Sequence, residues 1–378
     1  MKKKERTSFT RQKYDDYLWK PNSENLNYDA FFKAFEYKTL RLRNRFVMAP
    51  MTRAQSPEGI PDQRVADYYG RRAAAEVGLI LTEGTVVDRP ASKNLKDIPD
   101  FHGKSALQGW SRVLEAVHRQ GGKIGPQIWH VGNSSAGWAP PVPFEHPDSM
   151  TPADIENTIM AFADAARSAA ALGFDVVEIH GAHGYLIDQF FWQNSNHRTD
   201  QYGGATIQER VRFGVDLVKA IRKAVGPDMP LIMRISQWKG QDYNARIVTT
   251  PQELENWVSP LANAGVDIFH ASQRRYWIPE FEGSDLNFAG WIKKITGRPT
   301  ITVGSVGLDV DFMDSFRKGA GGPPTSLDDL LRRFDRGDFD LIAVGRQLLQ
   351  DPEWVRKVKE HRLSDIQSFD SASLRVYH

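Results

Sequence analysis

Eight short apolar runs recur along the chain, and the segments between them carry the signals of helices. The runs are too continuous for antiparallel strands with one face in water and are typical of strands buried on both faces, as in a parallel sheet. The runs occupy residues 46–49, 78–81, 123–129, 176–179, 231–235, 267–271, 300–303 and 341–344. They predict eight strands of one parallel sheet.

The segments between the runs begin and end with residues typical of helix termini. Two of them start with a threonine, a proline and an acid at the third helical position: Thr151-Pro152-Ala153-Asp154 and Thr250-Pro251-Gln252-Glu253. Gly173 and Gly265 stand where the preceding helices should stop. Eight strands that are each followed by a helix predict an α/β fold, a single-domain (β/α)8 TIM barrel. A doubly wound sheet is the alternative, but no G-x-G-x-x-G follows the first strand.

The composition excludes several classes of protein and site. Lys and Arg number 49 against 47 Asp and Glu, and a net charge of +2 predicts neither a nucleic-acid nor a membrane partner. No apolar run approaches the roughly 18 residues of a membrane span. The chain has no cysteine, which excludes disulfides, thiolate nucleophiles and iron–sulfur clusters.

The N-terminus is basic, from Lys2 to Lys13, and is not followed by the apolar stretch of a secretory signal. We therefore expect a cytoplasmic protein whose first residues form a partly ordered extension over one end of the barrel.

In a TIM barrel the active site is built from the C-terminal ends of the strands and the loops after them. The strand ends richest in reactive residues are, in chain order, Pro50-Met51-Thr52, Glu83-Gly84, Gln127-Ile128-Trp129-His130, His180-Gly181-Ala182-His183-Gly184-Tyr185, Arg234, Gly304-Ser305-Val306-Gly307 and Gly345-Arg346. The glycines after the last two strands let backbone amides approach a phosphate, and Arg346 can pair with its charge. Together with Arg234 at the same mouth, they predict a phosphorylated cofactor.

His180, His183 and Tyr185 form the densest cluster of reactive side chains. One interpretation is a metal site with two imidazoles and a carboxylate. The other is a pair of hydrogen-bond donors for an oxyanion, with the tyrosine hydroxyl as proton donor. No matching set of ligands appears at the other strand ends, so we expect the donor pair and no metal.

Several of these segments resemble one protein family. NRFVMAPMTRAQ (44–55), LTEGT (81–85), QIWH (127–130), HGAHGYLIDQFFWQNSNHRTDQYGG (180–204), MRIS (233–236), VGSVG and AVGR are similar to the Old Yellow Enzyme family, FMN-dependent ene-reductases built on a (β/α)8 barrel. The match covers roughly residues 35–362, and residues 180–204 are its most specific part. It divides the chain into an N-terminal extension (1–34), an FMN-binding barrel (35–362) and a C-terminal tail (363–378).

The resemblance implies non-covalent FMN as the cofactor and NADPH or NADH as the reductant. It implies FMN contacts from Pro50, Met51 and Thr52 beside the ring, Gly84, Gln127 and Arg234 at the pyrimidine end, and Gly304, Ser305, Gly345 and Arg346 at the phosphate. It makes His180 and His183 the donors to the substrate oxygen and Tyr185 the proton donor. We expect Trp129 and Tyr276 to line the substrate site.

Two segments are less clear in their role. The family often reads His-x-Gly-Arg after the third strand, whereas this chain has Asn133, which affects the substrate loop and not the flavin site. Residues 272–277 (SQRRYW) are rich in cations and aromatics, which suits a substrate or nicotinamide-phosphate wall and equally a solvated loop.

We therefore expect an enzyme that passes hydride from NAD(P)H through the flavin to the C=C bond of an α,β-unsaturated carbonyl compound, such as an enone. Flavin-dependent amine oxidation or demethylation on the same barrel is one alternative. A non-catalytic flavin-binding protein is the other, although binding alone needs no proton donor such as Tyr185. The sequence leaves open a homo-oligomer and the choice between NADH and NADPH.

Overall fold

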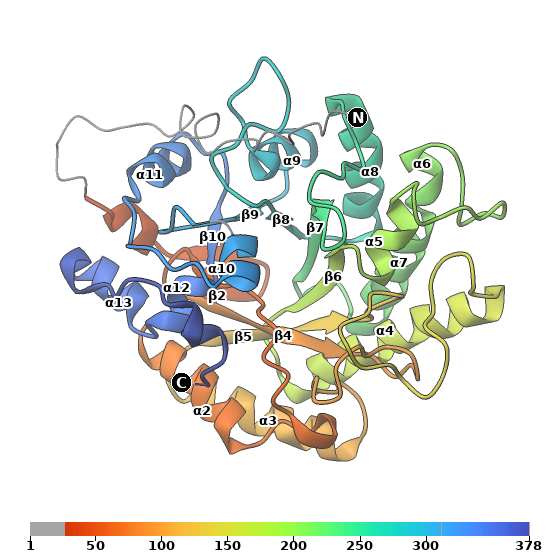
Figure 1. The fold of residues 1–378 in the computed structure, drawn as a ribbon, viewed down its shortest axis with the longest axis horizontal. Coiled ribbons are helices and arrows are strands. Elements are labelled where there is room, and N and C mark those ends of the chain that lie inside the picture. The colour runs from red at the N-terminus through yellow and green to blue at the C-terminus, as the bar shows by residue number, and fades with distance from the viewer. Residues whose placement is uncertain (1–26, 311, 378) are drawn as a thin grey trace, which may run out of the picture.

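The computed structural model describes residues 27–310 and 312–377, and its centre is a closed barrel of parallel strands (Figure 1). The order around the barrel is β10-β3-β4-β5-β6-β7-β8-β9, so the last strand pairs with the first. The strands are β3 (Phe46–Met48), β4 (Leu79–Val86), β5 (Lys123–Trp129), β6 (Val177–His183), β7 (Leu231–Lys239), β8 (Ile268–Ser272), β9 (Thr300–Val303) and β10 (Leu341–Val344). The predicted (β/α)8 barrel is confirmed.

Three strands are longer than the sequence predicted. β4, β6 and β7 continue past the predicted ends at residues 81, 179 and 235. Register shifts interrupt the pairing of β4 between Leu81 and Gly84 and that of β6 between Gly181 and His183. Apolar runs report the burial of side chains, whereas backbone pairing continues through the polar residues that follow. Several site residues that were predicted to lie in loops therefore lie in strands.

Helices surround the barrel (Figure 1). They are α2 (Gln63–Ala74), α3 (Lys104–His118), α4 (Pro152–Leu172), α5 (Leu186–Phe191), α6 (Ile207–Arg210), α7 (Arg212–Val225), α8 (Pro251–Ala264), α9 (Phe288–Thr296), α10 (Phe312–Lys318), α11 (Asp328–Asp335), α12 (Arg346–Gln350) and α13 (Trp354–Lys359). The helix starts predicted at Thr151 and Thr250 are confirmed, each as a capping box. Among the described residues, no helix is both long and apolar enough to cross a membrane.

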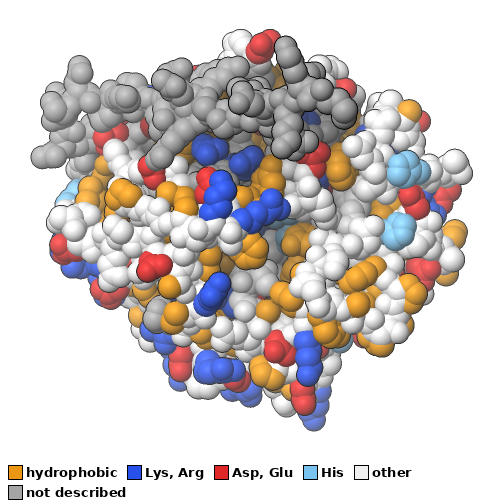
Figure 2. All heavy atoms as spheres, in the orientation of Figure 1, with side chains coloured by type: hydrophobic (Ala, Val, Ile, Leu, Met, Phe, Trp, Pro, Cys, Tyr) orange, Lys and Arg blue, Asp and Glu red, His pale blue; other side chains and the backbone are white. Residues whose placement is uncertain are grey.

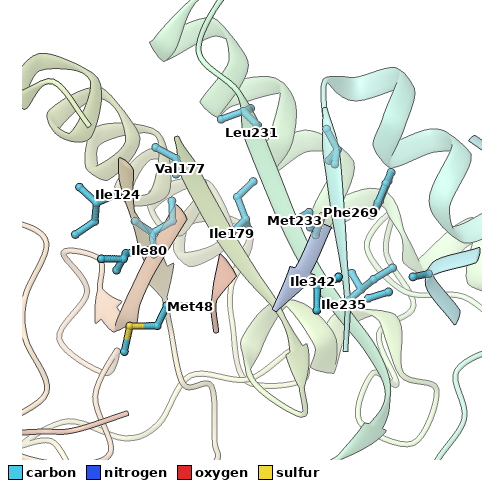
Figure 3. Close-up of a cluster of buried hydrophobic side chains, with 14 of the residues drawn as sticks. Met48, Ile80, Ile124, Val177, Ile179, Leu231, Met233, Ile235, Phe269 and Ile342 are labelled. Atoms are coloured by element: carbon cyan, nitrogen blue, oxygen red, sulfur yellow. The ribbon is translucent and has the colours of Figure 1, made fainter. Parts of the chain in front are cut away.

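Strand side chains alternate between the helices and the barrel interior. The outward set packs against the helices and includes Met48, Ile80, Ile124, Val177, Ile179, Leu231, Met233, Ile235, Phe269 and Ile342 (Figure 3). The inward set forms a second buried cluster that includes Val47, Leu79, Val176, Ile232, Ile268, Ile301 and Leu341. Because side chains alternate along a strand, residues 178, 180, 234 and 270 also face inward. The barrel interior thus changes from apolar to polar toward the C-terminal ends of the strands.

A hairpin that the sequence analysis did not predict closes the other end of the barrel. Its strands are β1 (Phe35–Tyr37) and β2 (Leu40–Leu42), which pair antiparallel. Phe35, Leu40 and Leu42 join the inward apolar cluster. Among the described residues, this hairpin covers the N-terminal end of the barrel, so the C-terminal end is the one open to a ligand.

The two predicted terminal segments are partly described. Residues 1–26 of the N-terminal extension lie outside the described residues, while Phe31 in the 3-10 helix η1 (Asp29–Phe32) is buried against Phe46. The C-terminal segment contains the 3-10 helices η3 (Leu363–Asp365) and η4 (Ser371–Leu374). The predicted domain boundaries at residues 35 and 362 stay predictions.

Candidate active site

The reactive residues predicted at the fourth strand end lie together. His183 takes a left-handed backbone conformation with φ of 65°, where the pairing of β6 with β7 shifts register. The ring centroids of His180 and His183 are 5.3 Å apart, and those of His180 and Tyr185 are 4.9 Å apart. Trp129 from β5 lies 4.7 Å from Tyr185 and 5.7 Å from His180. We call these four residues the mouth cluster.

Both histidines of the mouth cluster are neutral. Burial, reinforced by the positive charge of nearby Arg234, lowers the pKa of His180 and of His183 well below the ordinary value. The Ala182 N–H donates to His180 Nδ1 at 3.3 Å, which leaves the His180 proton on Nε2. Burial also raises the pKa of Tyr185 to about 12, so the phenol keeps its proton at neutral pH.

Ser272, from the segment 272–277, and two aromatic residues that the sequence analysis did not single out hold His183 in place. Ser272 Oγ, at the end of β8, lies 2.7 Å from His183 Nε2. The indole of Trp238 stacks on the His183 ring at 4.2 Å, and Tyr243 stacks on Trp238 at 5.4 Å. Trp238 was missed because β7 was predicted to end at residue 235, which left the indole in a loop.

A buried polar network lies one layer deeper in the barrel. Gln127 Nε2 donates to Glu178 Oε1 at 2.7 Å, and His270 Nδ1 lies 2.7 Å from Glu178 Oε2. Glu178 and His270 are fully buried. Burial lowers the pKa of Arg234, and the nearby Glu178 opposes this shift. The sequence analysis missed Glu178 and His270, although a charged or polar residue inside an apolar run was the signal that could have found them.

This network fits the pyrimidine end of FMN. Arg234 is 7% exposed, yet its Nε has no hydrogen-bond partner among the described residues. A buried cation with an uncommitted donor is costly unless an acceptor completes its hydrogen bonds. The carbonyl-rich pyrimidine edge of a flavin supplies such acceptors. Gln127 and Arg234, the two residues predicted to bind this end, thus share one buried site.

The predicted phosphate residues also lie together. Gly304 and Ser305 have φ of 135° and 51°, and a Cβ on Gly304 would overlap the backbone of Gln273. Arg346, 8% exposed, follows Gly345 at the start of α12 and donates to Ser305 Oγ at 3.1 Å and to Ser315 Oγ at 2.7 Å. A guanidinium and two hydroxyls suit a phosphate. Lys and Arg side chains gather near the centre of the face that carries α10 and α12 (Figure 2).

The predicted wall beside the flavin ring is held by a buried carboxylate. Thr52 is exposed at the barrel mouth, between buried Pro50 and buried Arg53. Glu83 Oε2 accepts the N–H groups of Arg53 at 2.8 Å and of Ala54 at 2.9 Å. Burial raises the pKa of Glu83 to about 7. Glu83 thereby orders the backbone that follows Thr52.

Glu83 makes the stability of the protein depend on pH. Its pKa is higher in the folded chain, about 7, than the ordinary 4.5, so the folded state retains a proton that the unfolded state releases in this window. The free energy of unfolding therefore falls as pH rises from about 4.5 to about 7, by about 3 kcal/mol in total. Between pH 5 and pH 8, the free energy of unfolding should fall less in Glu83→Gln than in the wild type. Urea denaturation at each pH measures this difference.

The matched control for this substitution is Glu115→Gln, on the exposed face of α3. It should show the wild-type pH dependence. An unchanged pH dependence in Glu83→Gln would show that this carboxyl does not titrate in the window.

Gly84 has a steric role that involves the mouth cluster. A Cβ at Gly84 would overlap Cε3 of Trp129, so only glycine lets the indole lie where it does. Gly84→Ala should displace the Trp129 ring and destabilise the fold by about 1–3 kcal/mol, the usual cost of overpacking. Thermal denaturation together with tryptophan fluorescence tests this expectation, and an unshifted melting temperature would contradict it.

One predicted substrate residue is not brought to the mouth cluster. Tyr276 is 3% exposed, and its ring packs edge-on against Trp277. Burial, with the charge of Asp329 from α11, raises its pKa above the ordinary value. Tyr276 therefore lies under α11, and the expectation that it lines the substrate site is not supported. Trp277 and residues of α11 surround this ring, which the charged residues beside it in the sequence did not reveal.

The mouth cluster can stabilise an oxygen that gains negative charge. Neutral imidazoles that donate from a desolvated site act most strongly on charge that develops during a reaction. A protonated phenol beside them can supply a proton. Among residues 27–310 and 312–377, no group of three His, Asp or Glu side chains is placed to hold a metal ion.

Comparison with known proteins identifies the family. Residues 30–321 match the model of the NADH:flavin oxidoreductase / NADH oxidase family. An NADH oxidase of Thermoanaerobacter brockii is 34% identical over 357 residues, which cover 89% of this chain and 51% of the relative, so the chain spans about half of that protein. The 12-oxophytodienoate reductase 7 of Oryza sativa subsp. japonica is 33% identical over 376 residues and 90% of each chain.

A solved structure agrees on the fold. Morphinone reductase in complex with tetrahydroNAD superposes with a TM-score of 0.74 at 24% identity, over 91% of this chain and 94% of that one. The family binds FMN, and the buried polar network and the phosphate residues of this chain fit that cofactor. The chain belongs to the NADH:flavin oxidoreductase / NADH oxidase family, the Old Yellow Enzyme family, and is an FMN-dependent oxidoreductase that uses NAD(P)H.

Proposed function

We propose that this chain is an ene-reductase, which reduces the C=C bond of α,β-unsaturated carbonyl compounds with NAD(P)H. The observation that carries the proposal is that two neutral imidazoles, His180 and His183, lie beside the protonated phenol of Tyr185 at the barrel mouth. A relative named for the reduction of 12-oxophytodienoate, an oxo compound, supports the substrate class.

One set of residues would bind the cofactor, and another set, the mouth cluster, would act on the substrate. FMN, when bound, supplies the hydride chemistry between NAD(P)H and carbon. Arg234 and Gln127 would hold the pyrimidine end of FMN, and Arg346 and Ser305 its phosphate. The cofactor would then lie in the polar upper part of the barrel, next to the mouth cluster.

The mouth cluster acts on the substrate oxygen and carbon. His180 donates from Nε2 to the carbonyl oxygen. His183 donates from Nδ1, with Ser272 Oγ donating to its Nε2, so the negative charge that develops on the substrate oxygen is stabilised by both histidines. Tyr185 gives a proton to the α-carbon. No oxyanion develops when an amine is oxidised, so an amine substrate would make no use of this donor pair. The donor pair therefore favours an enone as the substrate class.

A substrate comparison tests this proposal. The purified holoenzyme, without oxygen, should oxidise NADPH or NADH in step with the formation of cyclohexanone from 2-cyclohexenone. Trimethylamine should not reduce the bound flavin. Flavin reduction by the amine, with no cyclohexanone formed, would replace the proposal with amine oxidation.

The same assay compares NADPH with NADH, a choice that the sequence leaves open. The cytoplasmic location and a homo-oligomeric state stay predictions.

The phosphate site gives a separate prediction. Arg346→Ala removes the guanidinium expected to pair with the FMN phosphate, and a lost hydrogen bond to a charged group should raise the Kd for FMN about 10- to 100-fold. Titration of the apoprotein with FMN measures this, and cofactor released by heat should chromatograph as FMN. Arg212→Ala, which removes a surface arginine paired with Asp216, should leave the Kd unchanged. Equal affinity in both variants would remove Arg346 from the phosphate site.

A further inference from the structure

A fully buried ion pair lies directly behind the mouth cluster, and the proposed function gives it no role. Lys239 Nζ is 2.7 Å from Asp188 Oδ2 and 2.8 Å from Oδ1, and both side chains are 0% exposed. Lys239 ends β7 and Asp188 lies in α5, so the pair joins two elements that flank the C-terminal end of β6.

Each partner also touches the segment that carries the reactive residues. Asp188 Oδ2 accepts the Gly184 N–H at 2.6 Å. Lys239 is the register partner of His183 in the β6–β7 ladder, and the Gly240 N–H donates to the His183 carbonyl at 3.0 Å. Asp188 therefore holds Gly184, the residue between His183 and Tyr185, and Lys239 belongs to β7, the strand that pairs with His183.

This segment needs such support because its backbone is strained. His183 has φ of 65°, a left-handed conformation that disfavours residues with a side chain. Strained conformations persist only where the surrounding structure fixes them, and they are common at functional sites. Ser236 adds to the restraint, since its Oγ accepts the His183 N–H at 2.9 Å and its carbonyl accepts from Lys239 Nζ at 3.2 Å.

The ion pair is poorly explained by stability alone. Taking two charges out of water costs several kcal/mol per ion, so a buried pair is often no more stabilising than apolar residues of the same volume. Removing one partner, by contrast, leaves a buried charge without compensation. A pair of this kind is useful where it fixes one geometry, and here that geometry is the turn from His183 to Tyr185.

We propose that the Lys239–Asp188 ion pair is a positioning device that holds His183 and Tyr185 in the geometry that binds an anionic oxygen. Lys239 and Asp188 touch no substrate atom in this account and act through the Gly184 amide and the β6–β7 ladder. The inference rests on the proposed function only for the identity of the ligand, because the restraint on the backbone can be measured without any ligand.

The experiment uses the FMN-loaded enzyme in four forms: wild type, Asp188→Asn, Lys239→Met, and the double variant. The first readout is hydrogen exchange, followed by mass spectrometry, of peptides covering residues 180–188. The second is the Kd of pentafluorophenolate, followed by the long-wavelength charge-transfer band that an anion gives next to oxidised flavin. FMN content and melting temperature are recorded for each form.

In both single variants, the backbone amide hydrogens of residues 183–185 should exchange at least tenfold faster than in the wild type. Both variants should bind pentafluorophenolate at least tenfold more weakly, while FMN content stays at the wild-type level. The double variant leaves no buried charge without a partner, so its melting temperature should return toward the wild-type value. Because it lacks the ion pair, it should keep the fast exchange and the weak binding of the single variants, a combination that a purely structural role would not give. Wild-type exchange and affinity in the double variant would overturn the proposal.

The matched control is Asp329→Asn, which breaks the buried pair of Asp329 with Arg333 in α11 (side chains 3% and 2% exposed, 2.8 Å). It should lower the melting temperature without changing exchange at residues 183–185 or the phenolate Kd. Single variants that keep wild-type exchange and affinity would overturn the proposal. A wild type without a charge-transfer band would instead refute the oxyanion site, and the exchange data would still decide whether the ion pair positions the turn.

Discussion

Replacement of His180 and His183 together by alanine is expected to abolish the charge-transfer band of bound phenolate and to leave FMN in place. The loss of a single oxyanion donor lowers the rate by about 10²–10³, so the kcat/KM for 2-cyclohexenone should fall at least that far. FMN should remain because its expected contacts, Gln127, Arg234 and Arg346, are on β5, β7 and α12, away from β6. Phenolate titration and steady-state kinetics measure the two effects.

The control for this double variant is His197→Ala. His197 is an exposed histidine whose Nδ1 lies 2.7 Å from Asp148 Oδ2, and its loss should change neither the band nor the turnover. A band that persists in the double variant would show that the anion binds elsewhere. Loss of FMN along with the band would mean that the histidines hold the barrel mouth together instead of the ligand.

Tyr185→Phe should separate the two half-reactions. The substitution removes one hydroxyl, so reduction of the flavin by NAD(P)H should keep nearly its normal rate. Reduction of 2-cyclohexenone should fall by about 10²–10⁴-fold, because the α-carbon then lacks a positioned acid. A nitroalkene should be affected much less, since its nitronate product can leave without that proton. Stopped-flow absorbance resolves both half-reactions.

Tyr202→Phe provides the matched control, because Tyr202 packs against Phe213 in the helical layer, outside the mouth cluster. Its half-reactions should match those of the wild type. If Tyr185→Phe slowed flavin reduction and enone reduction equally, the hydroxyl would be a structural element and not the proton donor.

The fold was predictable because burial leaves a clear pattern in the sequence. The runs at 46–49 and 341–344 became the strands β3 and β10 that close the barrel, since strands covered on both faces are apolar at most positions. The hairpin of β1 and β2 was missed because each of its strands has a charged residue at its centre, Glu36 or Arg41, so neither forms an apolar run. Its role as a plug depends on tertiary contacts with the inward cluster.

The site was predictable where reactive residues follow an apolar run and hidden where they lie within one. His180, His183, Tyr185 and Trp129 lie together as their strand ends suggested. Glu178 and His270 are inside the runs, so reading those runs as uniformly apolar concealed the buried network. Tyr276 follows a strand end but lies beside Trp277 and near α11, apart from the mouth cluster, so position after a strand alone does not fix where a side chain lies.

The ion pair of Lys239 and Asp188 could not be inferred from the sequence at all. The two residues are 51 positions apart, and neither stands at a predicted strand end. Only the extension of β7 past residue 235 and the packing of α5 bring them into contact.

The most direct test of the central claim is the reoxidation of the reduced enzyme by an enone without oxygen. The bound flavin is first reduced with one equivalent of NADPH or NADH and then mixed with 2-cyclohexenone in a stopped-flow instrument. We expect the absorbance of oxidised flavin to return in a single turnover, with one cyclohexanone formed for each flavin. A flavin that stays reduced with the enone, yet is reoxidised at once by oxygen, would contradict the assignment of this barrel as an ene-reductase.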